Sequence, residues 1–191
     1  MPHGPRPKLS GREPVLVTLK VRKEIASLRV RRVLLHVTAA VAKAVVRFGV
    51  RIVEYSVQRD HVHLLVEAES KPALSRAMKG LSVRLARAIH RALARKGTVF
   101  ADRYHARVLT TPRQTRNALA YVLCNGRKHG HAPSRRGWLD PCSTASAFDG
   151  WNVAIALTTR ATAAPRTWLL RVGWRRGGLL DPDHHPGQLP S

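Results

Sequence analysis

The stretch SVQRDHVHLLVE, residues 56–67, is the most informative part of this chain, and its pattern predicts a β-strand. Successive side chains of a strand point to opposite faces, so His61 and His63 project from one face. Two imidazoles at this spacing can each give one nitrogen to a single metal ion. The alternative is a pair of exposed histidines that bind nothing. The apolar residues of the stretch fall on the opposite face and can enter a core: Val62, Leu64 and Val66.

The rest of the chain suggests a mixed α+β protein. Alternating residues predict strands, and apolar residues at a helical period predict helices. Arg59 and Asp60 form a short connection that predicts an antiparallel hairpin ending in the histidine strand. We expect Gly49, Gly97 and Gly126 to end the three helices. The predicted order is strand, helix, two strands, helix, strand, helix, at residues 15–21, 27–48, 50–58, 61–67, 72–96, 104–110 and 112–125.

This order matches the split β-α-β pattern of a ferredoxin-like fold, in which helices pack on an antiparallel sheet. We therefore expect a flexible basic arm at 1–13, a main domain at 14–130 and an irregular C-terminal extension at 131–191. The extension holds all four tryptophans, which either stack on bases or anchor the extension to the sheet.

Composition points to a nucleic-acid partner. Thirty-four Lys and Arg against eleven Asp and Glu give the 191 residues a formal charge of +23. Such a chain attracts polyanions, with nucleic acid first and an anionic membrane surface second. No apolar run approaches the roughly 18 residues of a membrane span, and the N-terminus lacks a signal-peptide core, so we expect a cytoplasmic protein. Cys124 and Cys142 are too few for a disulfide framework and are expected to be reduced.

The third helix carries a second candidate group. At about 100° per residue, Asn117, Tyr121 and Asn125 lie on one side, away from the apolar stripe. This places a phenol at one height and an amide one turn further on. The alternative is an ordinary surface tyrosine.

Acidic residues gather around the histidines in a chain that has few of them. Glu54, Asp60, Glu67 and Glu69 fall within sixteen positions and could hold a cation or orient an imidazole. Alternatively, they only offset nearby arginines.

Taken together, these motifs resemble a known family. The residues that carry the resemblance are His61-Val62-His63-Leu64-Leu65, a long basic helix, the Phe-x-x-Arg-Tyr segment from Phe100 to Tyr104, and Tyr121-x-x-x-Asn125. Their order is similar to that of the single-tyrosine HUH transposases, and most similar to the REP-associated branch, over residues 15–130. Gly126 departs from the pattern, because relatives often carry proline there. Asn125 stands where others carry Gln.

The resemblance implies metal-dependent nicking and rejoining of single-stranded DNA. It assigns His61, His63 and Asn125 to a divalent metal, Mg²⁺ or Mn²⁺, and Tyr121 to the attack that leaves a 5′-phosphotyrosine. Imidazoles by themselves favour zinc, so only the resemblance points to magnesium or manganese. The implied partner is single-stranded or hairpin DNA, bound by a monomer or a homodimer with the site completed within one chain or across two.

Basic side chains could follow the DNA backbone, or they could simply form a solvated face. His105 is a further candidate ligand. Two rival functions stay open: a domesticated, non-catalytic protein that binds hairpin DNA, and a two-histidine metallohydrolase in which Tyr121 plays no part. The predicted DNA-binding residues are Arg76, Lys79, Arg84, Arg87, Arg91, Arg103 and Arg107.

Overall fold

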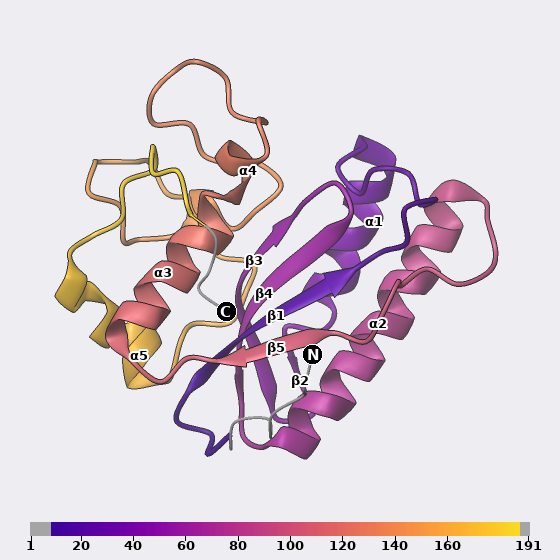
Figure 1. Cartoon of the computed structure of the whole chain (residues 1–191), viewed down its shortest axis with the longest axis horizontal. Coiled ribbons are helices and arrows are strands. Elements are labelled where there is room, and N and C mark those ends of the chain that lie inside the picture. Colours follow the sequence, from indigo (N-terminus) through magenta and orange to yellow (C-terminus); the bar gives the residue numbers. More distant parts are fainter. Residues whose placement is uncertain (1–8, 188–191) are drawn as a thin grey trace.

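A computed structural model describes residues 9–187 (Figure 1). Residues 1–8 of the predicted basic arm lie outside this range. The centre of the fold is a five-stranded sheet in the order β2-β3-β4-β1-β5, and every neighbouring pair is antiparallel. The α+β prediction is thereby confirmed. The strands are β1 (Pro14–Lys20), β2 (Val46–Arg47), β3 (Val50–Val57), β4 (His61–Ala68) and β5 (His105–Val108).

The histidine strand is β4, and it forms the predicted hairpin with β3. Val57 pairs with Val62, and the backbone N–H of Gln58 donates to the carbonyl of His61 at 2.8 Å. The two-residue link at Arg59 and Asp60 fixes this register, and a register slip of one residue would turn every side chain of β4 to the other face. The register of the hairpin therefore sets the sheet face on which the side chains of His61 and His63 lie.

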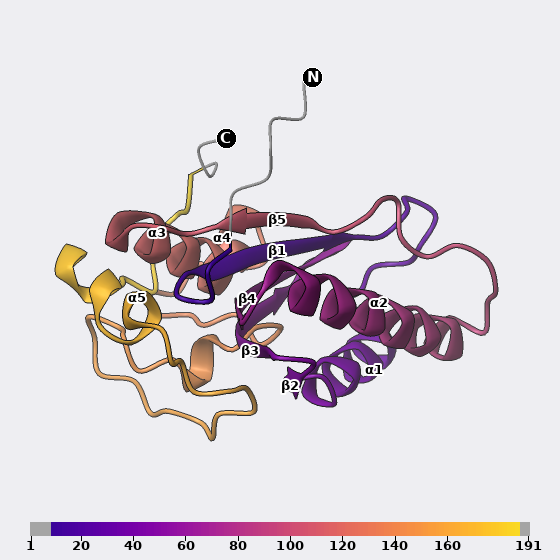
Figure 2. The same ribbon diagram turned by 90° about the horizontal axis from the view of Figure 1, so that it is seen from below.

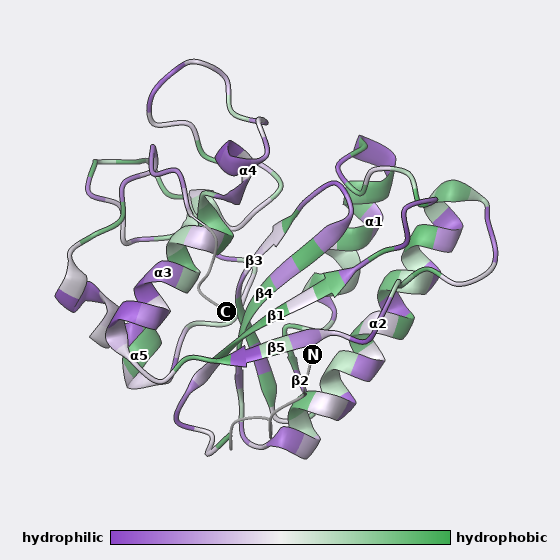
Figure 3. Cartoon of the chain, in the orientation of Figure 1, coloured by the Kyte–Doolittle hydropathy of each residue, from purple (hydrophilic) through white to green (hydrophobic). Residues whose placement is uncertain are grey.

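Helices α1 (Arg31–Ala42) and α2 (Lys71–Leu93) pack together on one face of the sheet (Figures 1 and 2). Their apolar residues form one core with the side chains of β4 that the sequence assigned to it: Val62, Leu64 and Val66. The Ser70 hydroxyl caps α2 by accepting from the Ala73 N–H at 3.2 Å. Outside the core-facing stripe the helix is polar, as the alternating colours of Figure 3 show.

The predicted helix over 27–48 was wrong at its C-terminal end. α1 stops at Ala42, and the following residues form β2, which pairs with β3. Phe48 and Gly49 make the connecting turn with φ values of 54° and 72°. Two successive left-handed residues suit a tight hairpin. Gly49 is therefore a hairpin residue and does not end the helix.

Helix α3 (Pro112–Leu123) packs on the opposite face of the sheet from α1 and α2 (Figure 1). Leu119, Val122 and Leu123 join a second core with Leu16 and Leu65 of the sheet. After Cys124 the chain continues as a short helix, α4 (Asn125–Lys128). The prediction that Gly126 ends the helix was wrong, because this residue lies inside α4.

The C-terminal extension covers the outer side of α3. It contains η1 (Ala145–Ala147), α5 (Trp168–Arg171) and η2 (Gly173–Gly177). Trp151 and Trp174 are buried in the second core, so these two tryptophans are structural anchors. Trp168 is 48 % exposed. The boundary at residue 130 stays a prediction.

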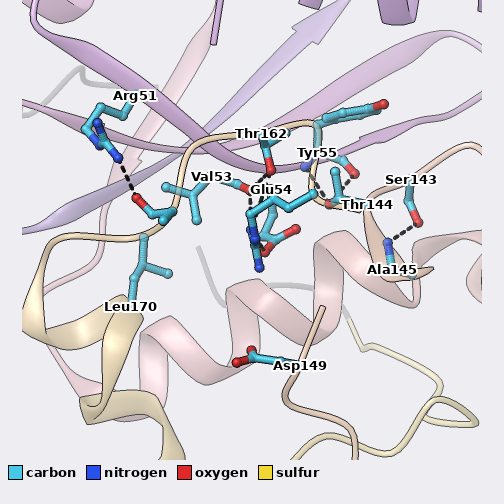
Figure 4. Close-up of polar contacts among 12 residues, drawn as sticks. Arg51, Val53, Glu54, Tyr55, Ser143, Thr144, Ala145, Asp149, Thr162 and Leu170 are labelled. Carbon is cyan, nitrogen blue, oxygen red and sulfur yellow. Dashed lines mark hydrogen bonds and ion pairs between the residues drawn. The ribbon is translucent and has the colours of Figure 1, made fainter. Parts of the chain in front are cut away.

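Hydrogen bonds tie the extension to β3 (Figure 4). The Thr162 hydroxyl donates to the Val53 carbonyl at 2.7 Å, and the Thr144 N–H donates to the Tyr55 carbonyl at 3.0 Å. Both cysteines are free and buried, as expected. Within residues 9–187 no helix has the length and apolar character needed to cross a membrane.

Candidate active site

The structure brings three of the predicted site residues together within one chain. The ring centroids of His61 and His63 lie 4.5 Å apart, and that of Tyr121 lies 4.9 Å from His63. β4 presents the histidines on the face that α3 covers, and α3 supplies the tyrosine. The sequence left open whether the site forms within one chain or across two. In this arrangement one protomer is sufficient for the contact.

Each histidine is held through its Nδ1 atom. Asp60 Oδ1 lies 2.6 Å from His61 Nδ1, and Thr18 Oγ1 lies 2.9 Å from His63 Nδ1. Such contacts fix the ring orientation and leave Nε2 as the nitrogen available to a ligand. Sequence analysis missed Thr18. The contact between Thr18 and His63 depends on the pairing of β1 with β4, which sets the two residues opposite each other.

The region concentrates buried polar atoms that have no partner. Among the residues described, nine buried side-chain nitrogen or oxygen atoms lack a hydrogen bond. Six of them belong to four residues: Ser56, Gln58, His63 and Asn125. Buried polar groups are nearly always paired, so these atoms are candidates to bind a water, an ion or a ligand. Asn125 is fully buried, and neither atom of its amide is satisfied.

These donors fit a divalent metal. In the described part of the chain, no group of three or more His, Cys, Asp or Glu side chains is arranged to hold one. A site would therefore need an amide beside the two imidazoles, and Asn125 offers an unpaired Oδ1. His63 Nε2 is likewise buried and unpaired. Nitrogen and oxygen donors together suit several divalent ions.

The expected acidic cluster does not form around the histidines. Only Asp60 contacts one of them. Glu54 pairs with Arg160 at 2.8 Å, while Glu67 lies 3.6 Å from Arg51 and accepts from backbone N–H groups of the extension. These carboxylates instead offset arginines and fasten the extension to the sheet.

Burial sets the protonation of the site. It lowers the pKa of His63 well below the usual histidine range, and electrostatic interactions with His61, His129 and Lys128 act in the same direction. A neutral imidazole is the form that binds metals. Burial raises the pKa of Tyr121. To lose its proton at neutral pH, the phenol therefore needs a base or a positive charge close to it.

Two cationic or titratable residues beyond Tyr121 were not singled out from the sequence. Lys128 Nζ lies 5.2 Å from the centre of the Tyr121 ring. The His129 ring lies 5.5 Å from that of His61, and burial lowers the pKa of His129. Both residues sit at the end of α4, which turns the chain back over the histidines. No local motif indicated this reversal.

The predicted DNA-binding residues fall into two groups. Those of α2 belong to a helix that lies across the sheet from α3 (Figure 2): Arg76, Lys79, Arg84, Arg87 and Arg91. Arg103 precedes β5 and Arg107 lies on it, with Arg107 paired opposite Leu16. His105 is paired opposite Thr18, which separates it from His63 by two strand spacings, about 10 Å. The structure thus does not bring His105 beside the histidine pair.

The structure explains the glycine that replaces the expected proline. A Cβ atom built on Gly126 would collide with the carboxylate of Asp140 and touch the ring of Trp138. Asp140 is held there by Arg29, at 2.8 Å, and by the N–H of Cys142. Residue 126 therefore has to be small because of contacts made by the extension.

The fold is thus that of an α+β protein with an antiparallel sheet. Its candidate site lies on one face of this sheet, where two histidines of β4 meet a tyrosine of α3. More particularly, the chain belongs to the IS200-like transposase family, because the sequence model of that family matches residues 14–123. This match supports a role as a transposase. It ends at Leu123, before Asn125.

The first of two similar solved structures agrees with the fold. The structure of a REP-associated tyrosine transposase bound to a REP hairpin superposes with a TM-score of 0.61 at 16 % identity, covering 87 % of this chain and 100 % of that one. A candidate transposase from Deinococcus radiodurans R1 gives 0.44 at 20 % identity, covering 70 % and 98 %. No curated protein matches the chain.

Proposed function

We propose that this transposase nicks and rejoins single-stranded DNA through Tyr121, as a step in DNA transposition. The observation that supports this most directly is the position of the Tyr121 ring, 4.9 Å from that of His63 on the neighbouring strand. Aromatic rings often pack edge to face, and it is the unpaired ring nitrogen of the buried His63 that favours a functional role for this contact.

The chemistry exchanges one phosphodiester for another. The Tyr121 oxygen bonds to phosphorus, and the bond from phosphorus to the 3′ oxygen breaks. The products are a 5′-phosphotyrosine and a free 3′-hydroxyl, so the proton lost by the phenol balances the one gained by the leaving oxygen. Because the phosphotyrosine keeps the bond energy, a second 3′-hydroxyl can reverse the step and join strands.

The chain's own residues prepare this step. His61, His63 and Asn125 would hold a Mg²⁺ or Mn²⁺ ion, which when bound supplies Lewis-acid polarisation of a phosphate oxygen. Asp60 and Thr18 fix the two imidazoles. Lys128, whose Nζ lies 5.2 Å from the centre of the Tyr121 ring, would stabilise negative charge as the phenol loses its proton.

The DNA partner is proposed to be a single strand with a hairpin. The similar solved structure holds a REP hairpin, and the net charge of +23 favours any polyanion. Helices α1 and α2 border a groove of about 200 Å³ lined by Lys43, Arg84, Arg87 and Arg91. Neither helix contains an acidic residue. We propose that the basic residues of this layer, with Arg103 and Arg107, bind phosphates.

One gel assay tests this function against its rivals. Purified full-length protein is mixed with labelled hairpin-bearing single-stranded DNA and Mn²⁺ or Mg²⁺, and the products are separated under denaturing conditions. We expect a covalent adduct in wild type and in the control Tyr55→Phe, and none in Tyr121→Phe. Tyr55 is a suitable control because it packs against the core under α1 and α2.

The other outcomes identify the rivals. DNA binding in native gels without an adduct would favour the domesticated, non-catalytic hairpin-binding protein. Cleavage that survives Tyr121→Phe would favour the two-histidine metallohydrolase.

A further inference from the structure

Gln58 is a polar residue that neither the fold nor the proposed reaction has used. It is 1 % exposed, and its Oε1 and Nε2 atoms are both buried without a hydrogen-bond partner. Leaving a buried polar group unpaired costs on the order of 1–3 kcal/mol. A leucine of similar size would avoid this cost. The presence of a carboxamide here therefore favours a group that pairs with it.

The hairpin register places Gln58 beside the first histidine. Its N–H donates to the carbonyl of His61 at 2.8 Å, which makes the two residues direct cross-strand neighbours. Side chains of such a pair project from the same face with Cβ atoms about 4.5–5.5 Å apart. Ser56 is paired with His63 in the same way. Gln58 therefore faces the side of the sheet that carries the histidines and lies under α3.

The donor set also favours an additional oxygen. Two imidazoles favour zinc and other transition metals, whereas magnesium and manganese prefer oxygen ligands. Asn125 would supply one amide oxygen, and Gln58 would supply a second from the end of β3. Its side chain has the rotatable bonds to direct Oε1 toward the histidine rings.

We propose that Gln58 is a further ligand of the metal site, giving its carboxamide oxygen to the same cation as His61, His63 and Asn125. This rests on the proposed function, because it takes the metal site as given. It adds a residue that precedes the histidine motif and shifts the site from mainly nitrogen toward equal nitrogen and oxygen donors.

Mn²⁺ binding tests this without any measurement of DNA cleavage. Full-length protein freed of metal by chelation is titrated with Mn²⁺, and free Mn²⁺ is followed by electron paramagnetic resonance. We expect Gln58→Leu to weaken binding by about tenfold or more, the scale seen when a metal site loses a supporting group. Gln58→Glu keeps an oxygen donor and should bind at least as tightly as wild type.

A matched control removes an unpaired buried atom elsewhere. The Thr167 hydroxyl is also buried and unpartnered, but the Thr167 N–H donates to Glu67, six residues along β4 from His61. At about 3.3 Å per residue this is roughly 20 Å away. Thr167→Val should leave Mn²⁺ affinity unchanged. Thermal unfolding of each metal-free variant checks that it folds, and Gln58→Leu should be at least as stable as wild type.

The results separate this inference from the proposed function. If Gln58→Leu binds Mn²⁺ within twofold of wild type while His63→Ala loses binding, the metal site stands and Gln58 is not a ligand. A Gln58→Glu variant that binds more weakly than wild type would also refute the assignment. If wild type binds no Mn²⁺, both proposals fail. If Gln58→Leu changes stability but leaves Mn²⁺ affinity unchanged, Gln58 is not a ligand and its carboxamide pairs with a buried water instead.

Discussion

His63 is only 3 % exposed, yet one of its ring nitrogens has no partner. Burial is the main reason that it resists protonation, and electrostatic interactions with the groups around it add to the effect. In the metal-free protein this lowers the free energy of unfolding at acidic pH, because His63 binds a proton more readily in the unfolded chain than in the folded one. The residue that we propose as a metal ligand thus makes the fold sensitive to acid.

We predict that stability falls as pH drops below about 6.5, the ordinary histidine pKa. In that range the unfolded state binds more protons than the native state, so the free energy of unfolding decreases with falling pH. His63→Gln should lose less stability than wild type between pH 7.5 and 5.5, measured by urea unfolding with a chelator present.

His105→Gln serves as the control, because His105 is exposed on β5 and does not lie beside the histidine pair. Equal pH responses in His63→Gln and wild type would contradict the prediction. His129, whose pKa burial also lowers, should contribute in the same direction as His63.

At the level of elements, the β2–β3 turn decides where α1 ends. Helical periodicity continues through the residues after Ala42, but pairing with β3 overrides it. The turn needs two left-handed residues, and Phe48 bears that strain while remaining 55 % exposed. Gly49 adopts the second left-handed conformation without steric strain, because it has no Cβ atom.

Two glycine substitutions should change stability in opposite directions. Gly49→Ala places a Cβ at a φ of 72° and against the Glu69 carboxylate, so we expect a loss of about 1–3 kcal/mol. Gly80→Ala lies inside α2, where the new Cβ would be 3.5 Å from Phe48, an ordinary contact. A gain of about 0.5–1 kcal/mol is expected there.

Chemical denaturation of both variants measures this. Equal effects in the two variants would argue that the left-handed turn at Phe48 and Gly49 is not formed in solution.

At the scale of the whole molecule, the C-terminal extension makes α3 a central element. The helix lies between the sheet and the extension, with Trp174 buried against it. The extension also supplies Asp140, which restricts residue 126 beside Asn125. The helix that carries Tyr121 therefore packs against residues that lie beyond the segment matched by the family.

Trp174→Ala should destabilise the protein by about 3–5 kcal/mol, because it removes a large, fully buried ring. Trp168→Ala, at a ring that is 48 % exposed, should cost less than about 1 kcal/mol. Thermal and urea unfolding compare the two variants. If Trp174→Ala also reduces Tyr121 adduct formation below the temperature at which it unfolds, the extension positions the helix. Similar stability of the two variants would contradict the packing described here.

The sequence alone determined the features that depend on neighbouring residues. Alternation put His61 and His63 on one face of a strand, and a two-residue link made the hairpin. Helical spacing predicted Tyr121 one turn before Asn125 on a single helix, but α3 ends at Leu123 and Asn125 begins α4. These are local, because strand and helix periods act over a few residues. The same patterns indicated the α+β class and, through a resemblance, the family.

Only the tertiary structure decided what those faces meet. It put α3 on the sheet face opposite α1 and α2, Thr18 and Gln58 beside the histidines, and Glu54 and Glu67 against arginines. It also separated the basic face of α2 from Tyr121. Contacts between segments far apart in sequence are selected by packing and by pairing of buried polar groups, and neither leaves a periodic signal in the chain.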